Sequence, residues 1–168
     1  MILVTGATGF VGQALMRDLA SRGMAYRGAS RRQGTGHVVV GDMTGDTDWS
    51  AALAGAEIVI HLAARTHVLN ETATDPLAAY RAVNVDATLN LARQAARAGV
   101  RQFVFLSSVK VNGERTLPGY PFRESDPPRP EDGYGISKRE AEDGLLELAG
   151  ETGMAVTVLR PRWSTVRG

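Results

Sequence analysis

Short apolar runs alternate with helical patterns along almost the whole chain, and this alternation restricts the fold more than any other feature. The runs that have the length and composition of strands are 2–4, 25–30, 38–40, 57–62, 103–106 and 156–159. The segments with helical spacing are 10–21, 49–53, 76–98 and 134–150. Apolar strands separated by helices pack into a parallel sheet that is covered on both faces. The sequence therefore predicts an α/β fold with a doubly wound parallel sheet.

Length and composition narrow the class of protein. With 168 residues, the chain is expected to form one domain, residues 1–168. Its net charge of +1 gives no field that would attract nucleic acid or a membrane surface, and no apolar run is long enough to span a bilayer. The sequence has no cysteine, which excludes disulfides and thiolate metal sites. The first apolar residues lack a basic flank, so we expect a cytoplasmic protein without a signal peptide.

A glycine-rich segment connects the first predicted strand to the first predicted helix. It reads Thr5-Gly6-Ala7-Thr8-Gly9-Phe10-Val11-Gly12. Gly6 is expected to permit a tight turn, Gly9 to let the backbone approach a pyrophosphate, and Gly12 to let the helix pack closely on the sheet. Free N–H groups at the helix N-terminus would then face phosphate groups. The placement favours a dinucleotide site over a glycine-rich turn without a ligand.

The end of the second predicted strand bears on the choice of dinucleotide. NAD-preferring proteins usually have Asp or Glu here to bind the ribose 2′-hydroxyl. This chain has Ser30-Arg31-Arg32 instead, which offers two guanidinium groups to a 2′-phosphate. The alternative is that both arginines are solvated loop residues. We therefore expect NADP(H) to be preferred, with NAD(H) possible.

A tyrosine, a lysine and two serines suggest proton transfer. Tyr134 and Lys138 are four residues apart and so lie on one face of a helix. A nearby ammonium would lower the pKa of the phenol, so that Tyr134 could exchange protons with a sugar hydroxyl or ketone. Ser107 and Ser108 follow a strand at the edge where ligands bind in such sheets, so a hydroxyl there can reach the reacting oxygen.

With these motifs together, the chain resembles the extended short-chain dehydrogenases/reductases, the NAD-dependent epimerase/dehydratase family, which have a Rossmann fold. The resemblance extends to Pro161 and rests on motifs in the family's order: Thr5 to Gly12, Gly41-Asp42-Met43, His61-Leu62-Ala63-Ala64, Phe105-Leu106-Ser107-Ser108, and Tyr134 with Lys138.

The resemblance implies a role for each matching residue. Ser108 would be the catalytic serine, Tyr134 the acid/base, and Lys138 the residue that holds the nicotinamide ribose and tunes Tyr134. Asn84 would be a structural asparagine. The other implied cofactor-binding residues are Gly6, Thr8, Gly9, Phe10, Val11, Gly12, Arg31, Arg32, Asp42, Met43, Leu62, Ala63, Ala64 and Ser107.

The resemblance also implies a substrate class. Asn112 stands where common members have tyrosine, as in the subgroup of UDP-glucose 4-epimerase-like proteins and UDP-4-keto-sugar reductases. The implied reaction is hydride transfer at C4 of a UDP-hexose, by an epimerase or by an NADPH-dependent 4-keto reductase. Two other hypotheses are a non-catalytic NAD(P)-binding module and a redox-sensing regulator. The partners are then a nucleotide sugar and a second copy of the chain, as a homodimer or by self-association.

Two further segments invite alternative interpretations. His61 and His67 could suggest a metal, but His61 belongs to a family motif and we expect no metal site. The proline-rich residues 112–132 could be a polyproline ligand, but the resemblance implies a substrate-side loop.

The chain departs from the family pattern after Pro161. Family members continue into a C-terminal substrate domain that we expect to be missing here. One codon choice for residues 161–168, read one base earlier, encodes the family-like P-L-V-Y-G-P-G. We interpret the last residues as the result of a single-base frameshift; the alternative is a truncation followed by tag residues.

Overall fold

The computed structural model describes residues 1–162 except 33, 35, 67–72 and 117. Residues 163–168, which carry most of the expected frameshift segment, and His67 lie outside the described residues. None of the described helices is long and apolar enough to cross a membrane.

The strands form one parallel sheet of six, in the order β3-β2-β1-β4-β5-β6. Their bounds are β1 Ile2–Thr5, β2 Tyr26–Ser30, β3 His37–Val39, β4 Ile58–His61, β5 Gln102–Leu106 and β6 Ala155–Leu159. The chain moves outward from β1 in one direction and then in the other, so the predicted doubly wound sheet is confirmed. The carboxyl ends of β1 and β4, where the direction changes, are where such sheets bind ligands.

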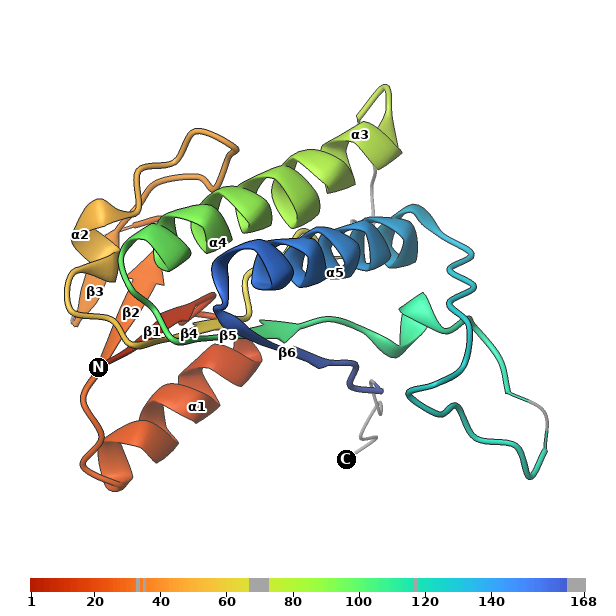
Figure 1. Cartoon of the computed structure of the whole chain (residues 1–168), viewed down its shortest axis with the longest axis horizontal. Helices are drawn as coiled ribbons and strands as arrows, with labels where there is room; N and C mark the ends of the chain where they lie inside the picture. Colours follow the sequence, from red (N-terminus) through yellow and green to blue (C-terminus); the bar gives the residue numbers. More distant parts are fainter. Residues whose placement is uncertain (33, 35, 67–72, 117, 163–168) are drawn as a thin grey trace.

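Helices cover both faces of the sheet (Figure 1). Their bounds are α1 Phe10–Ser21, α2 Ser50–Leu53, α3 Pro76–Arg81, α4 Ala87–Arg97 and α5 Gly133–Thr152. In Figure 1, α4 and α5 lie side by side over one face, and α1 lies against the other. The larger apolar core lies between the sheet and the pair α4 and α5, and includes Phe103, Phe105, Leu91 and Leu145.

The expected helix 76–98 is interrupted by a π-helical segment, Ala82–Asp86, between α3 and α4. Asp75 begins α3 by accepting a hydrogen bond from Ala78 N at 3.0 Å, and Pro76 occupies the first turn. The π segment was not predicted, because the apolar spacing on either side of it is helical. Insertions of this kind are frequent at functional sites, and this one borders the site described below.

Local chemistry also sets the bounds of α5. The Asp132 side chain accepts from Gly135 N at 2.6 Å, and Gly153 ends the helix with a left-handed φ of 74°. A 3-10 turn, Val109–Val111, follows β5 and begins at Ser108. These caps fix the two segments that carry the predicted catalytic residues.

Candidate functional site

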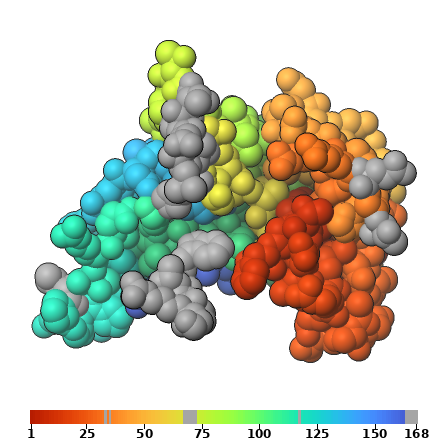
Figure 2. Space-filling view, turned by 180° about the vertical axis from the view of Figure 1, so that it is seen from behind, coloured from red at the N-terminus to blue at the C-terminus, as the bar shows by residue number. Residues whose placement is uncertain are grey.

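A crevice of about 1520 Å³ opens at the carboxyl ends of the strands. Figure 2 shows the surface hollowed between the red N-terminal segment and the yellow segment that follows β4. Most of the predicted site residues line it: Gly6, Thr8, Gly9, Phe10, Val11, Gly12, Arg31, Asp42, Met43, Leu62, Ala63, Ala64, Ser107 and Tyr134. Arg32 is exposed and does not line the crevice, and Ser108 and Lys138 are buried behind its wall.

The glycine segment forms one wall of the crevice with its backbone. Gly6 has a φ of 65°, as its expected turn requires. A Cβ on Gly12 would lie 2.2 Å from Gly6 O and 2.8 Å from Ala7 Cα. Gly12 is therefore needed for contact with the turn itself, rather than with the sheet as predicted.

The N-terminus of α1 faces the crevice without a side-chain cap. Gly9 precedes the helix in an extended conformation, and no side chain accepts a hydrogen bond from the first turn. Phe10 and Val11, the first helical residues, line the crevice. Uncapped N–H groups and the positive end of the helix dipole favour a bound anion.

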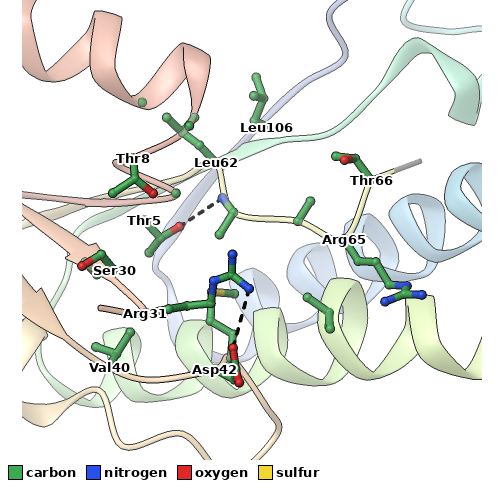
Figure 3. A pocket seen from close by; sticks show the side chains of 18 of the residues that line it. Thr5, Thr8, Ser30, Arg31, Val40, Asp42, Leu62, Arg65, Thr66 and Leu106 are labelled. Carbon is green, nitrogen blue, oxygen red and sulfur yellow. Dashed lines mark hydrogen bonds and ion pairs between the residues drawn. The ribbon is translucent and has the colours of Figure 1, made fainter. Parts of the chain in front are cut away.

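The end of the crevice at β2 holds a cation and a carboxylate. Arg31 Nη1 lies 3.7 Å from Asp42 Oδ1, and both side chains are mostly exposed. Figure 3 shows the two side chains pointing toward each other across this end of the crevice. The Arg32 carbonyl accepts from Ser30 Oγ at 2.5 Å, and its side chain is exposed. Of the two predicted arginines, Arg31 alone is therefore positioned to meet a ligand in the crevice.

His61 is buried and joins three segments through hydrogen bonds. Its Nδ1 lies 2.6 Å from Thr5 Oγ1, and its Nε2 lies 2.9 Å from Thr88 Oγ1, so both ring nitrogens are hydrogen-bonded. Thr5 Oγ1 also accepts from Ala63 N at 3.3 Å, the contact drawn in Figure 3. Burial, with a smaller contribution from the charge of Lys138, lowers the pKa of His61 to about 3. A neutral imidazole thus fixes the chain after β4 to β1.

Tyr134 lies at the opposite side of β1 from Arg31, on the first turn of α5. Its side chain is 6% exposed, is hydrogen-bonded to Ser108, and meets the Tyr80 ring edge-on at 6.2 Å between centroids. Burial raises the pKa of Tyr134, and the charge of Asp132 adds to that rise. The Ser108 hydrogen bond and the charge of Lys110 act in the lowering direction. The pKa of Tyr134 is thus raised, not lowered as expected from Lys138, because desolvation outweighs the hydrogen bond of Ser108 and the charge of Lys110.

Lys110 is a functional candidate that the sequence reasoning missed. Its Nζ lies 2.6 Å from Asp132 Oδ2 and 2.7 Å from Glu114 Oε1. Burial alone would lower the pKa of Lys110, but these two carboxylates raise it overall. Because Asp132 caps α5, this ion pair connects the turn after β5 to the helix that carries Tyr134. The sequence signal for Lys110 was its position two residues after Ser108.

Lys138 is 1% exposed, and its Nζ lies 4.1 Å from the centroid of the Phe105 ring. Burial lowers the pKa of Lys138 to about 7, and the charge of Glu142 opposes that change. Ser107 is also buried, and its hydroxyl donates to Glu142 Oε1 at 2.5 Å. The sequence analysis named Ser107 and Lys138 as site residues but did not name Glu142, which lies one turn after Lys138 on the same helix face.

Asn84 connects the π segment to both sides of the site. Its Nδ2 donates to Arg65 O at 3.0 Å and to Ser137 Oγ at 2.9 Å, and its Oδ1 accepts from Arg65 N at 2.8 Å. Ser137 in turn donates to Tyr134 O at 2.8 Å. The expected structural role of Asn84 thus has a direct geometric basis.

No group of three or more His, Asp or Glu side chains that could hold a metal occurs among the described residues. The crevice instead combines a helix N-terminus, a cation at one end and a buried tyrosine at the other. This arrangement can hold a long anionic ligand and transfer a proton at the tyrosine end.

Comparisons with known proteins agree with this geometry. A UDP-glucose 4-epimerase from Vibrio cholerae is 44% identical over 165 residues, which cover 95% of this chain and 50% of that protein. Thus the chain spans about half the length of this curated relative. A short-chain dehydrogenase/reductase superfamily protein from Agrobacterium tumefaciens, solved with bound NAD, is 36% identical with a TM-score of 0.82; the match covers 95% of this chain and 48% of that one.

MoeE5, solved with UDP-glucose and NAD, is 31% identical with a TM-score of 0.80, and the match covers 95% of this chain and 53% of that one. Residues 2–163 match the sequence profile of the NAD dependent epimerase/dehydratase family. The fold, the crevice and these matches lead to one conclusion: the chain belongs to the NAD dependent epimerase/dehydratase family.

Proposed function

We propose that residues 1–168 are one NAD(P)-binding domain of an oxidoreductase that transfers hydride at C4 of a UDP-hexose, as a 4-epimerase or a 4-keto reductase. The observation that carries this proposal is the pairing of Tyr134 with Ser108 at one end of a crevice whose middle is the uncapped N-terminus of α1. The UDP-glucose 4-epimerase from Vibrio cholerae supports the substrate class.

The residues present fit a dinucleotide. The N-terminus of α1 suits the pyrophosphate. An added Cβ at Gly9 would meet only Gly6 O, at 3.2 Å, so the space in front of Gly9 is open to a ligand. Arg31, Asp42 and Met43 would surround the adenosine, while Leu62, Ala63, Ala64 and Ser107 would border the nicotinamide half. When bound, the nicotinamide supplies or accepts the hydride.

The chain's own residues would handle the proton and the geometry. In the reducing direction Tyr134 Oη would donate its proton to the keto oxygen of the sugar, and in the reverse direction the phenolate would take a proton back from the sugar hydroxyl, with Ser108 orienting the same oxygen. The raised pKa of Tyr134 keeps the phenol protonated near neutral pH, which suits the direction in which a proton is donated. Lys138 would hold the nicotinamide ribose. Because Lys138 titrates near 7, its charge there depends on pH.

The preference for NADP(H) stays part of this proposal and rests on Arg31. A guanidinium at the crevice edge can bind a 2′-phosphate. Asp42 lies 3.7 Å from it and would compete for that cation, so the preference should be modest. NAD(H) remains the alternative, and it is the cofactor of both solved relatives described above.

The test measures binding and turnover separately. The chain is titrated with NADH and NADPH by fluorescence, and conversion of UDP-glucose to UDP-galactose is followed in the same samples. Tyr134→Phe should leave cofactor affinity within about twofold and reduce turnover by at least ~100-fold, the usual contribution of an acid/base group. The matched control is Tyr120→Phe, because Tyr120 is 75% exposed.

Each outcome has a meaning. Weakened cofactor binding in Tyr134→Phe would make Tyr134 structural and overturn its proposed role. Binding without turnover in the unmodified chain would favour the second hypothesis, a non-catalytic NAD(P)-binding module. Absence of binding would overturn both.

We also propose that the chain self-associates. Leu159 is 47% exposed, and Val104 and Leu106 on the same face of the sheet are only partly buried. Apolar patches of this kind favour association. Sedimentation at moderate concentration should show dimers or larger species, and a clean monomer would contradict the proposal.

A further inference from the structure

A buried carboxylate lies behind the catalytic wall of the crevice and has no place in the proton transfer above. Glu142, on α5, is 1% exposed. Its Oε1 accepts from Ser107 Oγ at 2.5 Å and from Arg160 Nε at 3.0 Å, and its Oε2 accepts from Arg160 Nη2 at 2.5 Å. Burial of a carboxylate is costly unless partners compensate it, and here both oxygens are occupied.

These contacts join the segments that carry the proposed catalytic residues. Ser107 precedes Ser108, and Ser107 N donates to Leu159 O at 2.7 Å. Arg160 follows β6 and also donates from Nη1 to Asn112 Oδ1 at 3.2 Å. Glu142 thereby fixes the end of β5, the end of β6 and α5 relative to one another.

Glu142 also shares a helix face with Lys138. Residues four apart on a helix are neighbours, and both side chains are buried against β5. Among the described residues, Arg160 from the end of β6 and Arg139, whose Nη1 lies 3.8 Å from Glu142 Oε2, also face this pair. Asp143 lies 2.6 Å from Arg139 Nη2 and also acts on the charge of Arg160. His61 on β4 also faces Lys138, but its low pKa leaves it neutral.

We propose that Glu142 is a positioning residue: its carboxylate holds the ends of β5 and β6 against α5 and places a negative charge one helical turn from the buried Lys138. The link to catalysis rests on the function proposed above. The link to Lys138 does not, because it concerns only two charges within the chain. Glu142 touches neither cofactor nor substrate, and acts through Lys138 and Ser107.

The sequence offers an unusually clean test, because Lys110 and Lys138 are its only lysines. In the full chain labelled with ¹³C at lysine Cε, NMR gives two signals, which Lys110→Arg assigns. Against pH, the Lys138 signal should have a midpoint of about 7, and the Lys110 signal a midpoint above its ordinary value. Glu142→Gln should lower the Lys138 midpoint by about one pH unit, the size of effect expected from losing a nearby opposite charge. The Lys110 midpoint should not move.

A second variant predicts a shift of opposite sign. Arg160→Gln removes the cation that competes for the Glu142 carboxylate, so the Lys138 midpoint should rise. Because this variant keeps the carboxylate, it tests the proposal even if Glu142→Gln fails to fold. An unchanged Lys138 midpoint in Glu142→Gln, or a fall in Arg160→Gln, would overturn the proposal.

The catalytic link has its own readout. NADH binding by Glu142→Gln should be weaker than in the unmodified chain at pH 7 and recover at pH 5, where Lys138 is protonated in both. Glu142→Asp, which keeps the charge, should restore binding at pH 7. Equal binding by Glu142→Gln and the unmodified chain at pH 7 would overturn the catalytic link. If the unmodified chain binds no NADH, the proposed function fails while the Lys138 titration still decides the role of Glu142.

Discussion

The two sides of the crevice differ in what they are made of. At the glycine segment the wall is backbone, made by Gly6, Gly9 and the uncapped start of α1, and the charged side chains Arg31 and Asp42 at the β2 end are mostly exposed. At β5 and α5 the wall is made of side chains, with Lys138, Glu142 and His61 each at most 1% exposed. Substitutions on the backbone side should act through steric clashes, whereas substitutions on the side-chain side should act by changing which groups are protonated. If the proposed function holds, the backbone side determines ligand binding by its shape, and the side-chain side determines proton transfer by its buried charges.

The largest expected effect tests the buried side. The pKa of His61 is about 3 in the folded chain and 6.5 as a model value, so the unfolded chain takes up this proton first as pH falls. The resulting stability is complete above pH 6.5 and is lost toward pH 3. Between pH 7 and pH 4 this amounts to about 3 kcal/mol of unfolding free energy.

Urea unfolding at the two pH values checks this. His61→Gln should show a loss of unfolding free energy between pH 7 and pH 4 that is smaller than that of the unmodified chain by about that amount. If His61→Gln and the unmodified chain lose the same free energy, His61 is not held neutral by the fold.

The next effect tests the backbone side. An added Cβ at Gly12 would meet Gly6 O at 2.2 Å and Ala7 Cα at 2.8 Å, and backbone cannot give way easily. Gly12→Ala should cost about 2 to 3 kcal/mol of unfolding free energy, independent of pH, and abolish dinucleotide binding. The control is Gly150→Ala in α5, where an added Cβ meets nothing within 4 Å and stability should rise by about 0.5 to 1 kcal/mol. If the loss of unfolding free energy in Gly12→Ala depended on pH, the backbone side and the side-chain side would not differ in the way described above.

The smallest effect concerns the exposed charges. Arg31→Ala should weaken NADPH binding by about fivefold, since an exposed ion pair contributes up to about 1 kcal/mol, and leave NADH binding unchanged. Arg32→Ala should change neither, because Arg32 does not line the crevice. Equal losses for both dinucleotides in Arg31→Ala would mean that Arg31 supports the loop rather than reading the 2′-phosphate.

The same contrast explains how much the sequence could predict. The strands, α1 and the cofactor-binding wall follow from local signals, namely apolar runs and glycine spacing, and nearly all the residues expected there line the crevice. The π segment Ala82–Asp86 could not be predicted, because its Asn84 is held by contacts with Arg65 and Ser137, which are distant in sequence.

The network of Glu142, Arg160 and Ser107 was missed because its members are far apart in sequence and meet only after the sheet forms. One signal was present: Glu142 shares a helix face with Tyr134, Lys138, Ala141 and Leu145, which are all buried. A charge on an otherwise buried face requires a partner.

The most direct test of the account is a titration of the isotope-labelled chain with NADH, followed through the backbone amide signals. We predict saturable shifts at Gly9, Val11 and Ala63, which line the crevice, and none at Gly144 or Leu146 on α5. Shifts confined to α5, or no saturable shift at the glycine segment, would contradict the assignment of the crevice as the dinucleotide site.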